Sequence, residues 1–137
     1  MALTKVTSNV INDDAITTPK IAGDSITNAK VGSEFTTTTA LTAGATVALD
    51  YTAAQVFTLT PNANTTIDIT NPVIGVSKVL IITGAGSSYT IGYTVGGAAG
   101  TFNKISGTYD DTASTKNFIQ ITCVGATEFW YTCSQIG

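Results

Sequence analysis

Apolar residues recur at every fifth position through the first 31 residues of the chain. A ten-residue unit is superimposed on this spacing, because residues 14–23 are followed by a similar segment that begins at Asp24. A period of five matches neither the 3.6-residue period of a helix nor the two-residue period of a strand. The apolar positions are Val6, Ile11, Ile16, Ile21, Ile26 and Val31. The repeat therefore predicts an extended arm, over residues 1–34, rather than an amphipathic helix or a flat strand.

This arm is too poor in apolar residues to order itself. Burial of six Val and Ile side chains stabilises the segment by less than the ordering of its backbone costs in conformational entropy. We therefore expect the arm to pack against something else. The alternatives are the arms of other copies, the globular domain of the same chain, and the surface of a partner. The six apolar side chains are the predicted interface residues of the arm.

The composition excludes several classes of partner. The chain has 137 residues, which is enough for one modest domain with an appendage, and a net charge of −3. It contains no arginine or histidine and only six lysines, so no basic surface for nucleic acid is expected. The longest aliphatic run, residues 79–82, is far too short to span a bilayer, and no secretory signal is visible at the N-terminus. We expect neither a nucleic-acid nor a membrane partner, and synthesis in the cytoplasm.

Residues 35–137 predict an all-β domain. Thr and Gly are abundant, and short β-rich segments alternate with Gly, Pro and Asn turns. The predicted strands are residues 46–51, 55–60, 65–70, 78–83, 89–95, 102–106, 117–124 and 127–134. This spacing is typical of a small antiparallel β-sandwich or jelly-roll-like domain. The apolar run of residues 79–82 is expected to be covered on both faces.

The last two strands predict their own register. A three-residue loop at residues 125–127 pairs Val124 with Glu128 and gives one wholly apolar face. That face comprises Ile119, Ile121, Cys123, Phe129, Tyr131 and Cys133. Trp130 then stands on the outer face, as a contact with a neighbouring subunit or a platform for a ligand. In another register Trp130 is simply part of the core, and the sequence leaves both readings open.

No catalytic, cofactor or metal site is expected. Cys123 and Cys133 lack a histidine that would activate a thiol or complete a zinc site, so buried free thiols are the favoured reading. Adjacent acids such as Asp110 and Asp111 are typical of hydrogen-bonded turns rather than of a calcium loop. The glycines of residues 84–88 indicate a turn, because no helix pattern follows them.

The N-terminal segment resembles those of virion proteins from tailed bacteriophages. The resemblance rests on residues 2–6 (ALTKV) and on the repeats AITTPKIA at residues 15–22 and SITNAKV at residues 25–31. Fibres and head-decoration proteins of such phages carry similar AITxxKIA repeats and are often trimers. The resemblance covers about the first quarter of the chain, and the Thr- and Gly-rich remainder is similar in style to the small β-domains of these proteins.

The resemblance implies a structural protein rather than an enzyme. The short chain favours a capsid decoration (cement) protein, a homotrimer on the outer surface of the phage head that binds the major capsid protein or another virion protein through its arm. The alternative is a short head or tail fibre whose β-domain binds host glycan through exposed aromatic side chains. Trp130 and Tyr89 are the candidate contact residues for that alternative.

Overall fold

The computed structural model describes residues 30–136 of the chain. The chain divides into two units, Met1–Val31 and Gly32–Gly137, and the elements of the second unit are described below. Five of the predicted interface residues lie outside the described residues: Val6, Ile11, Ile16, Ile21 and Ile26. The sixth, Val31, is exposed. The predicted domain boundary, after Glu34, falls within a short helix.

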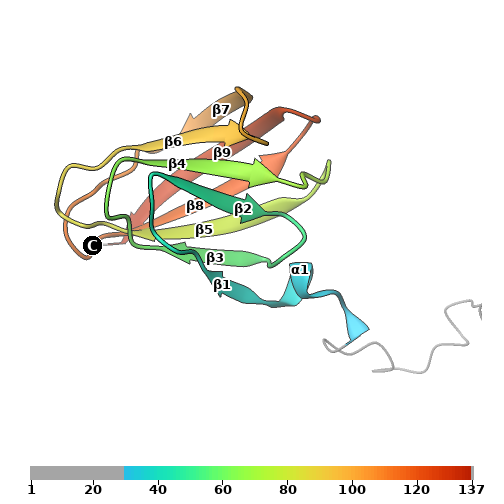
Figure 1. The fold of residues 1–137 in the computed structure, drawn as a ribbon, viewed down its shortest axis with the longest axis horizontal. Helices are drawn as coiled ribbons and strands as arrows, with labels where there is room; N and C mark the ends of the chain where they lie inside the picture. Colours follow the sequence, from blue (N-terminus) through green and yellow to red (C-terminus); the bar gives the residue numbers. More distant parts are fainter. Residues whose placement is uncertain (1–29, 137) are drawn as a thin grey trace, which may run out of the picture. The chain divides into compact units, whose positions relative to one another are not determined.

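The described elements are one helical turn and nine strands (Figure 1). They are α1 (Ser33–Thr36), β1 (Thr38–Ala40), β2 (Thr46–Asp50), β3 (Val56–Leu59), β4 (Thr65–Thr70), β5 (Ser77–Thr83), β6 (Ile91–Val95), β7 (Thr101–Ser106), β8 (Lys116–Cys123) and β9 (Glu128–Ile136). Each predicted strand corresponds to one of β2–β9, with ends that agree to within two residues. The predicted all-β class is therefore confirmed, whereas α1 and β1 were not predicted.

The strands form two sheets, and the first six alternate between them along the chain. The larger sheet has the order β1-β3-β5-β8-β9-β7, and the smaller has the order β2-β4-β6. A chain that crosses to the other sheet after every strand returns to each sheet in the same direction. The pairs β1–β3, β3–β5, β2–β4 and β4–β6 are accordingly parallel, like the stacked coils of a β-solenoid. The predicted antiparallel sandwich is wrong for this part of the domain.

Among the described strands, antiparallel pairing involves β8, which has a partner strand on each side. β8 pairs antiparallel with β5 and with β9, while β7 adds to β9 in parallel. Cys123 lies opposite Phe129 and Ile119 opposite Cys133, and the Val124 amide donates to the Glu128 carbonyl over 3.0 Å. The predicted register of the β8–β9 hairpin is therefore confirmed.

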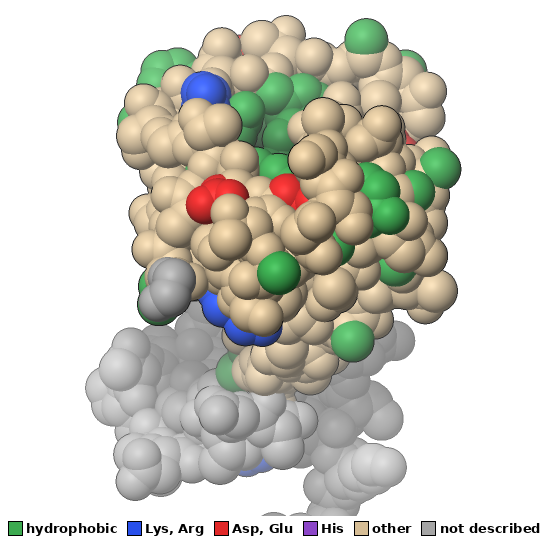
Figure 2. Space-filling model, turned by 90° about the vertical axis from the view of Figure 1, so that its left-hand side faces the viewer, with side chains coloured by type: hydrophobic (Ala, Val, Ile, Leu, Met, Phe, Trp, Pro, Cys, Tyr) green, Lys and Arg blue, Asp and Glu red, His purple; other side chains and the backbone are tan. Residues whose placement is uncertain are grey.

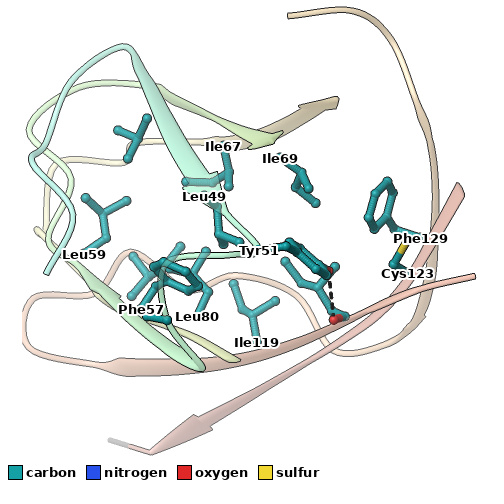
Figure 3. Packing of buried hydrophobic residues seen from close by; sticks show 14 of the residues in the cluster. Leu49, Tyr51, Phe57, Leu59, Ile67, Ile69, Leu80, Ile119, Cys123 and Phe129 are labelled. Carbon is teal, nitrogen blue, oxygen red and sulfur yellow. Dashed lines mark hydrogen bonds between the residues drawn. The ribbon is translucent and has the colours of Figure 1, made fainter. Parts of the chain in front are cut away.

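The hydrophobic core lies between the two sheets (Figure 3). Burial alternates along β4 and β8, as β-branched and aromatic residues on a half-buried strand require. Leu49, Ile67 and Ile69 from the smaller sheet face Phe57, Leu80, Ile119 and Phe129 from the larger one. Tyr51 extends through this core, and its hydroxyl donates to the Ile121 carbonyl over 3.2 Å.

Aromatic side chains close one long side of the core. The ring of Tyr93 on β6 lies 5.2 Å from that of Phe102 on β7 and 5.1 Å from that of Tyr131 on β9, measured between centroids. Phe102 in turn stacks on Phe129 at 5.2 Å. These contacts connect the edge of the smaller sheet to the larger one.

The two thiols are expected to be free. Cys123 and Cys133 are buried and unbridged, and their partners on the ladder place them four residues apart in register. Four residues correspond to roughly 13 Å, at about 3.3 Å per residue, against a Cα separation of at most about 7 Å for a disulfide. Mass spectrometry of the denatured, unreduced protein should find two alkylatable thiols. An intramolecular bridge would contradict the hairpin register.

Candidate functional site

The two aromatic residues predicted to be exposed lie at different ends of the domain. Trp130 is 47% exposed on the outer face of the larger sheet, and its indole Nε1 donates to Glu128 Oε1 over 3.0 Å. Tyr89 is half-buried in the loop between β5 and β6. Gln135, which borders the same groove as Tyr89, is five residues beyond Trp130 on β9, or roughly 17 Å at about 3.3 Å per residue. The structure therefore does not combine Trp130 and Tyr89 in one site.

Tyr89 lines an open groove between two loops at one end of the domain. One wall is the loop that follows β5, and the other is the segment between β7 and β8. The groove has a volume of about 920 Å³, and Tyr89, Tyr109, Asp110, Asp111 and Gln135 are among the residues that line it. Figure 2 is viewed onto this end of the domain, where acidic atoms lie near the middle of the face and basic atoms lie towards its periphery.

The carboxylate of Asp111 holds the two walls of this groove together. Its oxygens accept hydrogen bonds from the amides of Ala85, Ser87 and Tyr89, each over 2.9 Å. The Tyr109 hydroxyl donates a fourth, over 2.5 Å. Desolvation raises the pKa of Asp111. The hydrogen bonds from Tyr109 and the three amides stabilise the ionised carboxylate and outweigh desolvation, so the pKa of Asp111 lies well below its usual range. Asp111 is therefore a charged hub that orders the loop bearing Tyr89.

The backbone of the two loops approaches too closely for side chains at some positions. A Cβ atom at Gly84 would lie 2.2 Å from the Thr112 carbonyl oxygen, so only glycine fits there. The amide of Gly84 donates to Thr115, and that of Ser114 donates back to Gly84. The glycines that the sequence indicated as a turn thus allow the close packing of one wall against the other.

The buried side-chain amide of Asn117 holds the second wall of the groove, the segment between β7 and β8, in place. Asn117 on β8 is fully buried, and its Nδ2 donates to the Asp110 carbonyl over 2.7 Å. Its Oδ1 accepts from the Asp110 amide over 2.8 Å. The Asp110 side chain itself is exposed and caps the following turn, where its Oδ1 accepts from the Thr112 amide. The prediction that Asp110 and Asp111 form a hydrogen-bonded turn is confirmed.

Replacing Asp111 with asparagine is expected to destabilise the domain by about 1–3 kcal/mol, because an amide cannot accept all four hydrogen bonds of the carboxylate. A lowered folded-state pKa means that Asp111 stabilises the fold above its unfolded pKa of about 3.9, and that this contribution is lost as the pH falls towards the folded value. Urea unfolding at pH 7 and pH 3 should therefore give a smaller wild-type-to-variant difference at pH 3. Asp110→Asn is the matched control and should change stability much less. An equal effect at both pH values would contradict the claim that the ionised Asp111 carboxylate holds the two loops together.

A second ordered feature lies where the domain begins. Lys78 on β5 points inward and is fully buried, and its Nζ donates to the Glu34 carbonyl of α1. The same Nζ lies 5.3 Å from the ring centroid of Phe35 and 5.8 Å from that of Tyr51. Desolvation lowers the pKa of Lys78, and the charges of Glu34 and Asp50 offset only part of this effect. Lys78 therefore fastens α1, the first element of the domain, to the core.

The outer face of the larger sheet carries a third feature, which is exposed apolar area. Phe118 on β8 is 41% exposed on this face, where Trp130 also lies. Rows of Ser, Thr and Gln surround these rings, and Lys116 is the charged residue of β8 on the same face. Large exposed apolar side chains on a face with few charges are typical of a protein–protein contact.

Comparisons with known proteins found no match to this chain among protein-family models, curated proteins or solved structures. Within residues 30–136, His, Cys, Asp and Glu side chains nowhere gather in a group of three or more that could hold a metal ion. In the same range no helix has the length and apolar character needed to cross a membrane.

Sequence reasoning found Tyr89 and Trp130 but missed Lys78, Tyr109 and Gln135. Lys78 falls at a core position of the alternating pattern of β5, between Ser77 and Val79. A charged residue at an inward position was a signal for a buried contact. Tyr109 and Gln135 gave no such signal, because their proximity to Tyr89 depends on the packing of segments that are distant in the sequence.

Proposed function

We propose that this chain is a structural virion protein of a tailed bacteriophage, a head decoration (cement) protein that binds the shell as a homotrimer. The arm repeats of residues 1–31 would contact the major capsid protein or another virion protein, and the β-domain would stand on the outer surface of the head. The proposal rests first on the resemblance of the arm repeats to phage virion proteins. Binding of this kind stabilises the shell by mass action.

The structural observation that supports the proposal is the extent of the core within the β-domain. The core residues of the described part run from Val47 to Cys133, and the described domain begins with α1, which Lys78 fastens. The core of the described residues is thus built by the strands of the β-domain and the loops between them. In this proposal the apolar side chains of the repeat contact another surface, as an attachment arm requires.

The outer face of the larger sheet supports the homotrimer. Phe118 and Trp130 are large apolar side chains exposed on a face with few charges, and burial in a contact between copies would stabilise such an assembly. Trp130 already has its indole nitrogen paired with Glu128, so its ring can be covered without an unsatisfied donor.

Light scattering on the purified full-length chain is expected to give the mass of three copies. Co-sedimentation with capsid shells that lack the protein should then give saturable binding. Trp130→Ala and Phe118→Ala should shift the oligomer towards monomer at low micromolar concentration. A chain that stays monomeric both in solution and on shells would overturn the trimer, and a chain that never co-sediments with shells would overturn the decoration function.

A further inference from the structure

The groove at Tyr89 has the size and chemistry of a ligand site that the decoration function does not use. Its volume of about 920 Å³ lies within the range of small-molecule sites, roughly 300–1,000 Å³. We propose that it binds a neutral saccharide, with the sugar ring against Tyr89 and its hydroxyl groups bonded to Asp110 and Gln135. This inference is independent of the decoration function, because it depends on the domain and not on the arm.

The polar groups of the groove match the hydroxyl groups of a sugar. Within residues 30–136, neither the Tyr89 hydroxyl nor Gln135 Oε1 has a hydrogen-bond partner, while Gln135 Nε2 is held by the Thr108 carbonyl. The exposed Asp110 carboxylate accepts from the amide and the side chain of Thr112, which leaves about two of its roughly four lone-pair sites open. A sugar hydroxyl both donates and accepts, so it can pair with each of these groups.

The aromatic ring supplies the apolar part of the site. Tyr89 is half-buried and lines the groove, so the residue is held by its surroundings and remains accessible to a ligand. A tyrosine combines a flat apolar surface with a polar tip and has few rotatable bonds, so it loses little entropy on contact. The C–H-rich face of a pyranose is complementary to such a ring.

The charge of the groove selects among saccharides. Two carboxylates, Asp110 and Asp111, belong to its lining, whereas no lysine does. A sugar acid or a phosphate would therefore meet repulsion from these carboxylates, while Lys104, whose Nζ donates to the hydroxyl of the lining residue Thr108 over 3.4 Å, does not belong to the lining. Asp111 is already saturated by four hydrogen bonds, so the carboxylate that is open to a ligand is that of Asp110. A neutral sugar avoids the repulsion that an anion would meet and can pair its hydroxyl groups with Asp110 and Gln135.

The walls of the groove are preorganised. The Asp111 hub fixes the backbone at Ser87 and Tyr89, so a ligand would not have to order this loop. Two of the non-glycine residues with positive φ flank the groove, Ser88 at 60° and Ser114 at 71°. Such conformations cost energy and persist where the surroundings hold them in place, which occurs often at ligand sites.

An NMR titration of the full-length protein tests the proposal. Glucose, galactose and N-acetylglucosamine are the neutral probes, and each is titrated singly. Neutral oligosaccharides of these sugars are tested separately on a glycan array. At least one of the three sugars is expected to give saturable shifts at the amides of residues 86–89 and 109–112. Tyr89→Ala should weaken that binding by about 3- to 10-fold, the equivalent of an aromatic contact, whereas Tyr89→Phe should retain most of it.

Three matched probes decide the outcome. Trp130→Ala, at the other end of the sheet, should leave the titration unchanged, and glucuronate should bind more weakly than glucose. Binding of the positively charged glucosamine without binding of glucose would overturn the proposal in favour of a charge effect. An absence of saturable shifts with every neutral probe, or shifts that Tyr89→Ala leaves intact, would overturn it as well.

Discussion

Replacing Phe129 with alanine is expected to lower the free energy of unfolding of the domain by about 3–5 kcal/mol. The side chain is fully buried, and its ring packs edge-on against Tyr51 at 6.1 Å and stacks on Phe102 at 5.2 Å, measured between centroids. Truncation would leave a cavity between the two sheets at the point where the aromatic side chains connect them. Urea unfolding of the chain at a concentration at which it is monomeric, followed by tyrosine and tryptophan fluorescence, measures the loss.

Phe118→Ala is the matched control for this variant. It removes the same ring from the adjacent strand of the hairpin, but Phe118 is 41% exposed on the outer face. Its replacement should change the stability of the monomeric domain by less than about 1 kcal/mol. Equal losses for the two variants would show that the inner and outer faces of the hairpin are assigned wrongly.

The hairpin shows how much of this fold the sequence could predict. Alternation along β8 and β9 separates six apolar residues from Gln120, Thr122 and Trp130. Only a three-residue loop between the strands keeps the six apolar residues on one face of the hairpin. Because one residue of slip exposes the whole apolar set, the pattern determines the register. The strand positions were predictable for a similar reason, since turn residues separate each β-rich segment from the next.

Strand direction was not predictable in the same way. An alternating strand such as β4 has the same pattern whether its neighbour runs parallel or antiparallel. The direction depends on which sheet each connection leads to, and a short Gly- or Pro-rich loop does not specify that. The aliphatic run in β5 illustrates the limit as well: Val79 and Ile81 were expected to be covered, but they are half-buried on the outer face.

The candidate site was only partly predictable. Tyr89 and Trp130 were singled out as contact residues, and the structure places them at opposite ends of the sheet. The turn at Asp110 and Asp111 was predicted, because short acidic side chains accept hydrogen bonds from nearby backbone amides. The three amides that donate to Asp111 lie in a loop more than 20 residues earlier in the chain, and no local pattern could indicate them.

Removing residues 1–31 is expected to abolish binding to capsid shells and to leave the domain folded. The cut falls just before Gly32, so α1 and its contacts with Lys78 remain in the truncated protein. The core draws on residues from Val47 onward, and therefore the truncated domain should keep a β-type circular dichroism spectrum and a cooperative thermal transition. Co-sedimentation with shells measures the loss of binding. An arm that is dispensable for co-sedimentation would contradict the decoration function.

Single substitutions in the arm should act according to the five-residue period. Ile16→Ala and Ile26→Ala would each weaken shell binding by about 30-fold to 5,000-fold, the equivalent of about 2–5 kcal/mol for an isoleucine buried in an interface. Thr17→Ala and Asn28→Ala are the matched controls, because they lie within the same repeats but off the apolar positions, and they should have much smaller effects. If Ile16→Ala and Ile26→Ala bind shells as tightly as the wild type, the period has no role in attachment. In that case the decoration function loses its physical basis, whereas the saccharide site, which depends on Tyr89 and its groove, is unaffected.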